Sequence, residues 1–301
     1  MIKALLFFLL GSICAWLIEL PFGGWFLILG LALYIHFIFK EQRAFLFAWL
    51  FGLGYFCNAL WWIYVSLHDV GKITAPISVL AVIALSAYLA LFPAIAIKLV
   101  HQFHSSAARV IGLASSWAIM EWARGQLFTG FPWAGLAESQ VDGPFFAWAT
   151  IFGGLACTWF CVGLAAYLSQ GKHNLFTKFV ASITIVSASH ALGLISFTEP
   201  IGRPIDVTLI QGNFPQSLKF DPEYIHQQVS FYSNAIKSSD SHLVVAPETA
   251  FPLPLKAIPQ ELISNIKPNI AKKNVTLGVV STGNSGLPTN SAIALNQSNL
   301  I

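Results

Sequence analysis

Residues Leu243 to Phe251 read Leu-Val-Val-Ala-Pro-Glu-Thr-Ala-Phe, and this stretch decides the fold of the last third of the chain. The run from Leu243 to Ala246 is apolar and too short for a helix of its own, so it predicts a fully buried strand. Pro247 ends the strand because it has no backbone N–H to donate. Glu248 is therefore predicted to follow a buried strand directly, desolvated and held by rigid backbone.

Two interpretations of Glu248 remain open at this point. A carboxylate withdrawn from water binds a proton more tightly, which suits it to act as a general base. The alternative is a carboxylate at a turn or a helix N-terminus with a purely structural role. The strand pattern alone does not separate these two roles.

The sequence on both sides of this strand alternates strand and helix patterns. Strands are predicted at 206–211, 242–246, 275–281 and 291–296, and helices at 222–237 and 259–273. That order predicts a layered α/β domain over residues 198–301. Four strands and two helices would leave a sheet edge uncovered, which proteins normally avoid, so the domain is expected to be truncated.

Residues 1–197 have a different composition from this tail. The chain of 301 residues is 56% hydrophobic and 10% charged, whereas soluble domains have about 25% charged residues. The boundary falls at Thr198-Glu199-Pro200, where proline stops a helix. Windows of about 20 apolar residues predict a membrane all-α bundle of seven spans, at 2–20, 22–39, 44–67, 73–100, 110–128, 145–170 and 175–197. The tight connection through Pro21 also allows a re-entrant pair for the first two.

The distribution of Lys and Arg predicts the orientation of these spans. Only Lys72 and Arg124 fall near one side of the membrane. Seven residues fall on the other side, namely Lys3, Lys40, Arg43, Lys98, Arg109, Lys172 and Lys178. The positive-inside rule places the N-terminus in the cytoplasm, and seven crossings place the tail on the opposite face, which is the periplasm of a Gram-negative cell. A net charge of +3 without a basic aromatic patch argues against nucleic acid as a partner.

All four cysteines lie in apolar segments. Cys14, Cys57, Cys157 and Cys161 are therefore expected to pack as small hydrophobes, without disulfides and without a metal. The tail from 198 to 301 contains no cysteine. Any chemistry that Glu248 supports within this tail has no thiol nucleophile there.

Several motifs together resemble one known family. They are Glu121-Trp122-Ala123-Arg124-Gly125, then Leu127-Phe128-Thr129-Gly130-Phe131-Pro132-Trp133 and Ser139-Gln140, followed in the tail by Leu209-Ile210-Gln211-Gly212-Asn213-Phe214-Pro215-Gln216 and by Ala246-Pro247-Glu248-Thr249-Ala250. Their order, their spacing and the seven preceding spans look like bacterial apolipoprotein N-acyltransferase. The resemblance covers the whole chain.

The resemblance implies a fold and a catalytic set. The family's extramembrane domain is similar to nitrilases (the CN hydrolase fold), an α-β-β-α sandwich, and its catalytic residues are Glu, Lys and Cys. Glu248 matches the catalytic glutamate, whereas the family's lysine and cysteine come in segments that would lie past Ile301. This chain therefore looks like the N-terminal portion of such an enzyme. Phe220 is a departure, because the family usually carries Trp there.

The resemblance also implies a reaction in the bacterial inner membrane. A membrane phospholipid donates an acyl chain to a cysteine, and the thioester passes it to the N-terminal amine of a diacylated apolipoprotein. Both substrates are bilayer lipids, and no cofactor is expected. The alternatives are a membrane-tethered amidohydrolase of the nitrilase type and a catalytically inactive, truncated membrane protein.

The membrane block contributes its own candidates. Glu121 and Arg124 are three residues apart, so we expect them to share a helix face and form an ion pair near the membrane boundary. A contact with a lipid headgroup is the less favoured alternative. Five aromatic residues are expected at the same level, as an aromatic belt: Phe131, Trp133, Phe145, Phe146 and Trp148. Direct contact of Phe131 or Trp133 with an acyl chain is the less favoured alternative.

Overall fold

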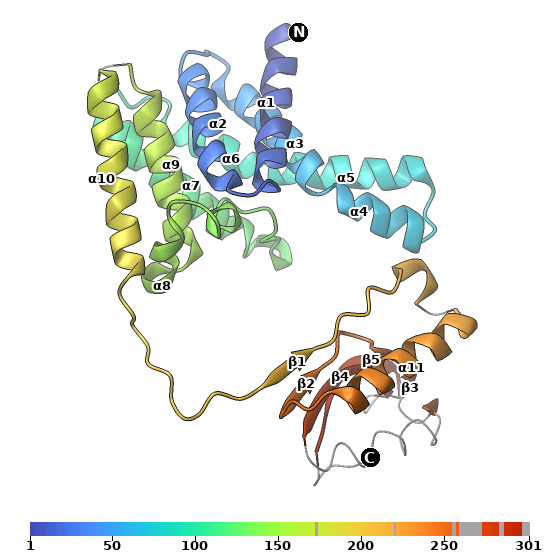
Figure 1. Cartoon of the computed structure of the whole chain (residues 1–301). Helices are drawn as coiled ribbons and strands as arrows, with labels where there is room; N and C mark the ends of the chain where they lie inside the picture. Colours follow the sequence, from blue (N-terminus) through green and yellow to red (C-terminus); the bar gives the residue numbers. More distant parts are fainter. Residues whose placement is uncertain (172–173, 220, 255–256, 259–272, 283–285, 297–301) are drawn as a thin grey trace. The chain divides into compact units, whose positions relative to one another are not determined.

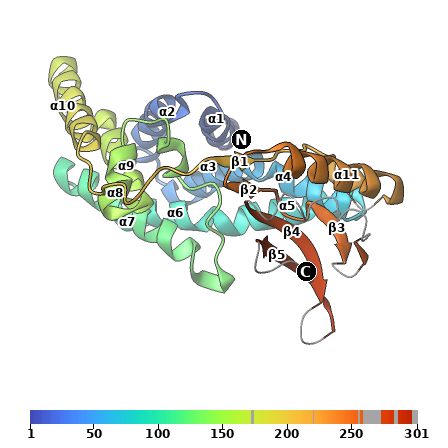
Figure 2. The ribbon, with the colours of Figure 1, turned by 60° about the horizontal axis from the view of Figure 1, so that its bottom comes forward.

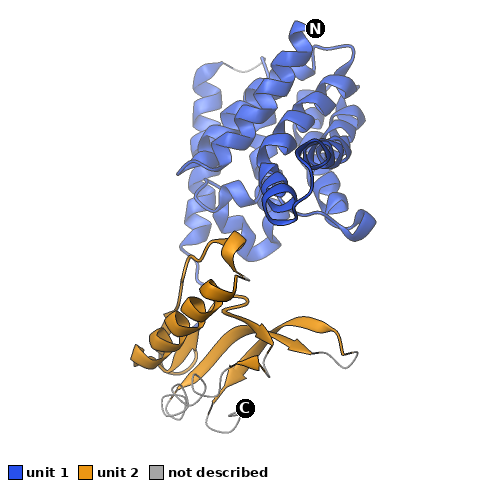
Figure 3. Cartoon of the chain, turned by 90° about the vertical axis from the view of Figure 1, so that its right-hand side faces the viewer, with its two compact units in different colours: residues 1–199 blue, residues 200–301 orange. Residues whose placement is uncertain are grey.

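The computed structural model describes residues 1–171, 174–219, 221–254, 257–258, 273–282 and 286–296. The chain divides into two compact units, residues 1–199 and 200–301 (Figure 3). Figure 1 colours the helices of the first unit from blue to yellow and the strands and helix of the second in orange and red. The predicted helix at 259–273 falls almost entirely outside the described residues, as does Phe220.

The first unit, called the helical unit below, consists of helices joined by short loops. Their bounds are α1 Ile2–Ile18, α2 Gly23–Ile38, α3 Ala44–Ala59, α4 Trp61–Val65, α5 Ala75–Leu89, α6 Leu91–Val100, α7 Ser106–Arg124, α8 Ala149–Phe152, α9 Gly154–Ser169 and α10 Leu175–Gly193. Single turns of π- or 3-10 helix lie at 66–70, 127–129, 138–140, 146–148 in this unit. Each of the seven predicted spans contains at least one of these helices.

Length and composition identify fewer helices that could cross a bilayer. The segment Ala75–Val100 and helix α10 qualify, and α3 with the segment Trp61–Val70 qualifies if the pair, bent by 51°, counts as one span. Three further apolar helices, α1, α2 and α9, are shorter than 18 residues. The prediction of an apolar helical block is thus confirmed, whereas the number of crossings stays a prediction.

Two of the predicted spans are broken helices, and a third contains a local irregularity. The segment 44–67 breaks at Leu60, where the two helices are bent by 51°. In the segment 73–100 the boundary between α5 and α6 falls at Ala90, three residues before Pro93, but Ala75–Val100 remains one span-length helix. The segment 145–170 breaks at Gly153, whose φ of +73° lies in the left-handed region that glycine adopts without strain. Apolar windows do not register such breaks because a kink leaves the mean hydropathy unchanged.

Close backbone contact holds α1 against α3. A Cβ added to Gly11 would collide with the carbonyl oxygen of Phe51, and one added to Gly54 would collide with that of Phe8. The Ser12 hydroxyl donates to the Gly54 carbonyl at 3.0 Å. Small residues and a hydrogen bond between helices are the usual means of association in a membrane, where burial of apolar surface gives no driving force.

Among its described residues the second unit, called the sheet unit, has one α-helix, a short 3-10 turn at Gln216–Leu218 and a five-stranded sheet. Its elements are β1 Val207–Leu209, α11 Pro222–Ser238, β2 Leu243–Val245, β3 Phe251–Pro254, β4 Asn274–Thr282 and β5 Pro288–Leu295. Parallel pairs join β1 to β2, β2 to β4 and β3 to β4, and β5 pairs antiparallel with β4. The four predicted strands are confirmed within a few residues at their ends. The sequence analysis missed β3.

One face of this sheet is covered by α11, as the rotated view in Figure 2 lets the reader follow. Val229, Tyr232 and Ile236 of α11 are buried in one cluster with side chains of the sheet, which include Val244, Val275, Leu277 and Val279. On the opposite face Leu209 remains 75% exposed. Within the described residues, the sheet is therefore covered by a helix on one face only.

The two units are connected by a segment without helix or strand, between the end of α10 at Gly193 and the start of β1 at Val207. Its apolar side chains lie open to solvent, and Ile201 is fully exposed.

Candidate functional site

The turn that carries Glu248 interrupts one edge of strand β4. Strands β2 and β3 both pair with β4, at Asn274–Thr276 and at Val279–Val280 respectively, and the chain leaves the ladder between them. The Ala246 N–H donates to the Thr276 carbonyl at 2.9 Å, and the Gly278 N–H donates to the Pro247 carbonyl at 3.2 Å. These bonds fix the turn to β4 before Glu248, and the pairing of Phe251 with Val279 fixes it after Glu248.

Gly278 is the residue of β4 that faces this turn. A Cβ added there would lie 2.7 Å from the Cα atom of Glu248 and would collide with the backbone nitrogen of Thr249. Thr249 itself has a φ of +53°, a conformation that costs energy for a β-branched residue. The backbone at Glu248 therefore lies directly on the sheet because residue 278 has no side chain.

The side chain of Glu248 is exposed, and it accepts a hydrogen bond of 2.6 Å from the Asn290 amide through Oε1. The expectation of a desolvated carboxylate is therefore wrong for the described structure. Ala246, Thr249 and Ala250 around it are buried, whereas Glu248 belongs to a turn on the sheet face that α11 does not cover and its side chain stays exposed. Glu248 does follow strand β2 closely, but only Val244 of that strand is buried while Leu243 and Val245 are half-buried, so the expectation of a fully buried strand is met in part. The rigidity of the position stays a prediction.

A second loop follows β1 on the neighbouring strand. Parallel strands β1 and β2 end on the same side of the sheet, which is where α/β domains place their ligand sites. Asn213 has a φ of +51° in this loop, and a Cβ on Gly212 would lie 2.5 Å from the hydroxyl oxygen of Tyr232. Burial raises the pKa of the Tyr232 hydroxyl, and a hydrogen bond with the Gly212 backbone lowers it by a smaller amount. The hydroxyl is therefore protonated at neutral pH.

Arg124 and Glu121 do not form the expected ion pair. The buried Arg124 guanidinium donates through Nη1 to the carbonyls of Phe131 (3.0 Å) and Trp133 (2.5 Å). Glu121 Oε1 instead accepts from the Leu136 N–H at 3.2 Å and the Thr158 hydroxyl at 3.1 Å. The physical reason is the loop 131–136, whose backbone groups would otherwise be buried without partners.

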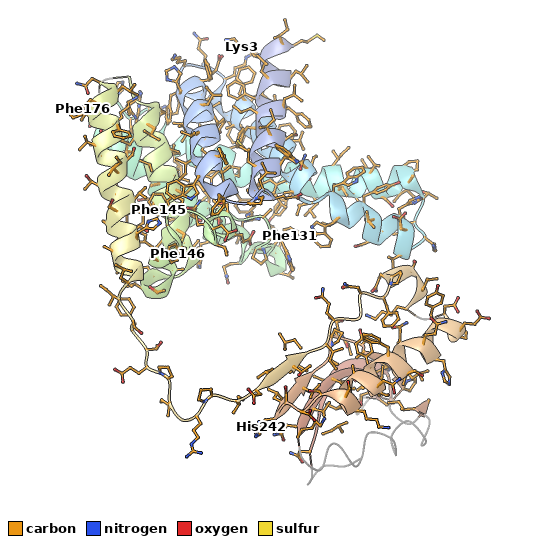
Figure 4. All side chains as sticks on the ribbon, in the orientation of Figure 1. Lys3, Phe131, Phe145, Phe146, Phe176 and His242 are labelled. Carbon is orange, nitrogen blue, oxygen red and sulfur yellow. The ribbon has the colours of Figure 1, made fainter. Side chains whose placement is uncertain are left out.

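The loop held by Arg124 presents two of the expected aromatic residues. The rings of Phe131 and Trp133 lie 5.1 Å apart, and Trp133 is 54% exposed. Phe145 is fully buried, so its expected place in an exposed aromatic belt is wrong. Trp148 stacks on Phe160 at 4.1 Å within the helical unit. The side chains of Phe131, Phe145 and Phe146 are labelled in Figure 4.

All four cysteines are free, as expected. The Cys157 thiol donates to the Phe145 carbonyl at 3.1 Å, and Cys161 accepts a weak bond from the buried Gln140 amide at 3.7 Å. Among the described residues no three His, Cys, Asp or Glu side chains converge as a metal site.

Asn290 and Gly278 were missed by the sequence analysis. A glycine inside a strand pattern signals close approach of another backbone, and Gly278 in Val-Thr-Leu-Gly-Val-Val carried that signal. Asn290 carried none, because its contact with Glu248 depends on the pairing of β4 with β5.

Comparisons with known proteins were made for the whole chain. The family model for the apolipoprotein N-acyltransferase N-terminal domain matches residues 11–167. A protein of Ralstonia nicotianae named apolipoprotein N-acyltransferase is 33% identical over 283 residues, which cover 90% of this chain and 54% of the relative. Proteins of the same name from Nitrosomonas europaea and Haemophilus influenzae are 37% and 34% identical, over 71% and 77% of this chain and 44% and 47% of each relative. The chain spans about half the length of these curated relatives.

Proposed function

Because the chain belongs to the apolipoprotein N-acyltransferase family, we propose that it supplies the membrane-embedded part and the catalytic glutamate of an enzyme that acylates lipoproteins. The donor is a bilayer phospholipid, and the acceptor is the N-terminal amine of a diacylated apolipoprotein. The observation that carries the proposal is the position of Glu248, in a turn fixed on Gly278 with its carboxylate open on the free face of the sheet.

In the first step Glu248 takes the proton of a cysteine thiol, and the thiolate attacks the carbonyl carbon of a phospholipid ester. The C–O bond breaks, a lysophospholipid leaves, and the acyl group remains on sulfur as a thioester. In the second step the lipoprotein amine attacks the thioester, the amide forms, and the thiol is regenerated. Residues 200–301 contain no cysteine, so we place the nucleophile in the portion of the relatives' length that this chain does not span. The resemblance to the family places the lysine there as well.

The finer features of the architecture belong to the same proposal. We propose seven crossings of the inner membrane, a cytoplasmic N-terminus and a periplasmic sheet unit, on the basis of the asymmetry of Lys and Arg. We also propose that the sheet unit, residues 198–301 in the sequence analysis, is part of a nitrilase-like α-β-β-α sandwich. The sheet with α11 on one face and an open opposite face supports this assignment.

The test is Glu248→Gln in an acyltransferase of the relatives' full length that contains this chain. An amide keeps the size of the side chain and the bond to Asn290 but cannot accept the thiol proton. Thioester formation should fall at least about 100-fold, the usual scale for the loss of a positioned base. The matched control is Glu223→Gln, an exposed glutamate in the first turn of α11, which should leave the rate unchanged.

Normal thioester formation by the folded Glu248→Gln protein would exclude Glu248 as the base. An assay of small amides with the unsubstituted full-length enzyme tests the amidohydrolase alternative, because that reaction would use the same glutamate. Hydrolysis of amides without acyl transfer to lipoprotein would identify a membrane-tethered amidohydrolase.

A further inference from the structure

Helix α10 is attached to the rest of the helical unit mainly at its two ends. Ser189 is the one residue of its described length that is buried. Near the first end the Lys178 ammonium donates to the Leu168 carbonyl of α9 at 2.6 Å. Near the second end the His190 ring lies 6.2 Å from the ring of Trp25 and 5.9 Å from that of Phe146. Figure 4 shows Phe176 near the first end and Phe146 towards the second.

An apolar groove runs between these two attachments. Its volume is about 900 Å³, within the range of ligand sites in proteins. One wall is α10, and the other comes from α2, α9 and Pro144. Bulky side chains dominate the walls, among them Trp25, Phe26, Leu29, Phe176 and Phe179.

The length of the groove matches one leaflet of a bilayer. From Leu175 to Val186 a helix rises about 17 Å at 1.5 Å per residue. Half of the hydrocarbon thickness of a bilayer is about 15 Å. The stretch from Leu175 to Val186 therefore has room for most of an extended acyl chain of one leaflet.

The polar groups of the groove gather at its Lys178 end. Lys178 lines the groove. Its ammonium group has three N–H donors, and one of them bonds to the Leu168 carbonyl. Nearby, the last turn of α9 is also bonded through Ser169 to His36 at 3.1 Å, and His36 contacts the Lys40 ammonium at 2.7 Å. This end is cationic, whereas the remainder of the groove is apolar apart from Ser182.

We propose that the groove between α10 and the α2–α9 wall is a binding site for a bilayer phospholipid, with an acyl chain in the groove and the phosphate at Lys178. Its charge separation matches such a lipid, with a cation at the headgroup depth and aromatic and leucine side chains along the tail. The site is independent of Glu248 and of acyl transfer.

The side chains that line the groove argue against a second helix as its occupant. Helices that pack in membranes approach through small residues, and Ala32 and Ser182 are the small residues of these walls. A lipid chain adapts to the space that these bulky side chains leave.

The experiment is native mass spectrometry of the purified 301-residue chain in detergent, titrated with phosphatidylglycerol. We expect one lipid to stay bound at low lipid concentration. Ser182→Trp fills the groove and should weaken this binding at least about 10-fold. The matched control is Thr184→Trp: both hydroxyls bond to the carbonyl four residues earlier, but Thr184 is exposed and does not line the groove.

A second variant fills the groove from its other wall: Ala32→Trp on α2 should weaken lipid binding as much as Ser182→Trp does. At the cationic end Lys178→Gln should weaken it about 5-fold, and Lys178→Arg should restore it. Circular dichroism spectra establish that each variant is folded. Equal binding by the wild type, Ser182→Trp and Ala32→Trp would overturn the site and leave only a nonspecific lipid shell. Unchanged binding by Lys178→Gln would overturn the assignment of the phosphate.

Discussion

The helical unit and the sheet unit distribute their polar groups in opposite ways. In the helical unit Arg124, Gln140 and Thr158 are buried, while large apolar side chains such as Leu80 and Phe176 are exposed. In the sheet unit the apolar side chains form one cluster under α11, while the carboxylate of Glu248 is exposed. The comparison teaches that the two units are folded for different surroundings. The first buries polar groups and leaves large apolar side chains on its surface, as helices in a membrane do. The second buries an apolar cluster under its helix, as a domain in water does, although Ile201 and Leu209 stay exposed.

The strongest test of this difference removes the buried cation of the helical unit. Arg124→Met should destabilise the unit by at least about 3 kcal/mol, because it leaves the carbonyls of Phe131, Pro132 and Trp133 without a donor in the interior. Thermal unfolding in detergent measures the effect. Arg109→Met is the matched control, since Arg109 donates to one carbonyl, that of Phe103. Equal losses for both variants would contradict the role of Arg124 as the anchor of the loop.

The next prediction compares exposed isoleucines of the two units. Ile183 lies at the middle of α10 and is 49% exposed, and Ile205 of the sheet unit is 63% exposed. Ile183→Asp should reduce membrane insertion of α10 by about 3 kcal/mol, the cost of a charge at the centre of a span. Ile205→Asp should change stability by less than about 0.5 kcal/mol. Insertion is measured with a glycosylation reporter, and efficient insertion of Ile183→Asp would contradict a lipid-facing α10.

A smaller effect is expected where the sheet unit carries its functional turn. Gly278→Ala should cost about 2 kcal/mol, the scale of overpacking, because the added Cβ collides with the backbone at Thr249. Urea unfolding monitored by circular dichroism measures it. Gly171→Ala serves as the control, because a Cβ there meets no atom within 4 Å. If both variants unfold alike, the close contact between the turn and β4 is not a constraint.

The smallest effect is expected at the surface of the helical unit. Lys3 and Glu41 form a 2.6 Å ion pair in which Lys3 is mostly exposed. Lys3→Met should therefore cost less than about 1 kcal/mol, because solvent screens the pair. Added salt should reduce the difference between wild type and variant further. A loss as large as that of Arg124→Met would show that exposure does not decide the value of a charge in this unit.

The sequence predicted the strands and helices where local apolar patterns suffice. Buried strands β2 and β4 stand out as runs of β-branched residues, and α11 has an apolar stripe between Pro222 and Ser238. Strand β3 was missed because Phe-Pro-Leu-Pro carries two prolines, which normally argue against a strand. They are tolerated because β3 pairs with β4 only at Phe251 and Pro254.

The candidate site was predictable in part. The place of Glu248 after β2 follows from the sequence alone, because Pro247 must end the strand. Its exposure does not follow, because that depends on which sheet face α11 covers. The partners of Glu121 and Arg124 could not be predicted from their spacing either. They are backbone groups of a later loop, and no side-chain pattern encodes them.

The segment between Gly193 and Val207 has a consequence that follows from its length alone. A chain of that length extends at most about 45 Å. Covalent geometry alone therefore sets an upper limit on the distance between the last residue of α10 and the first residue of β1, whatever conformation the segment adopts.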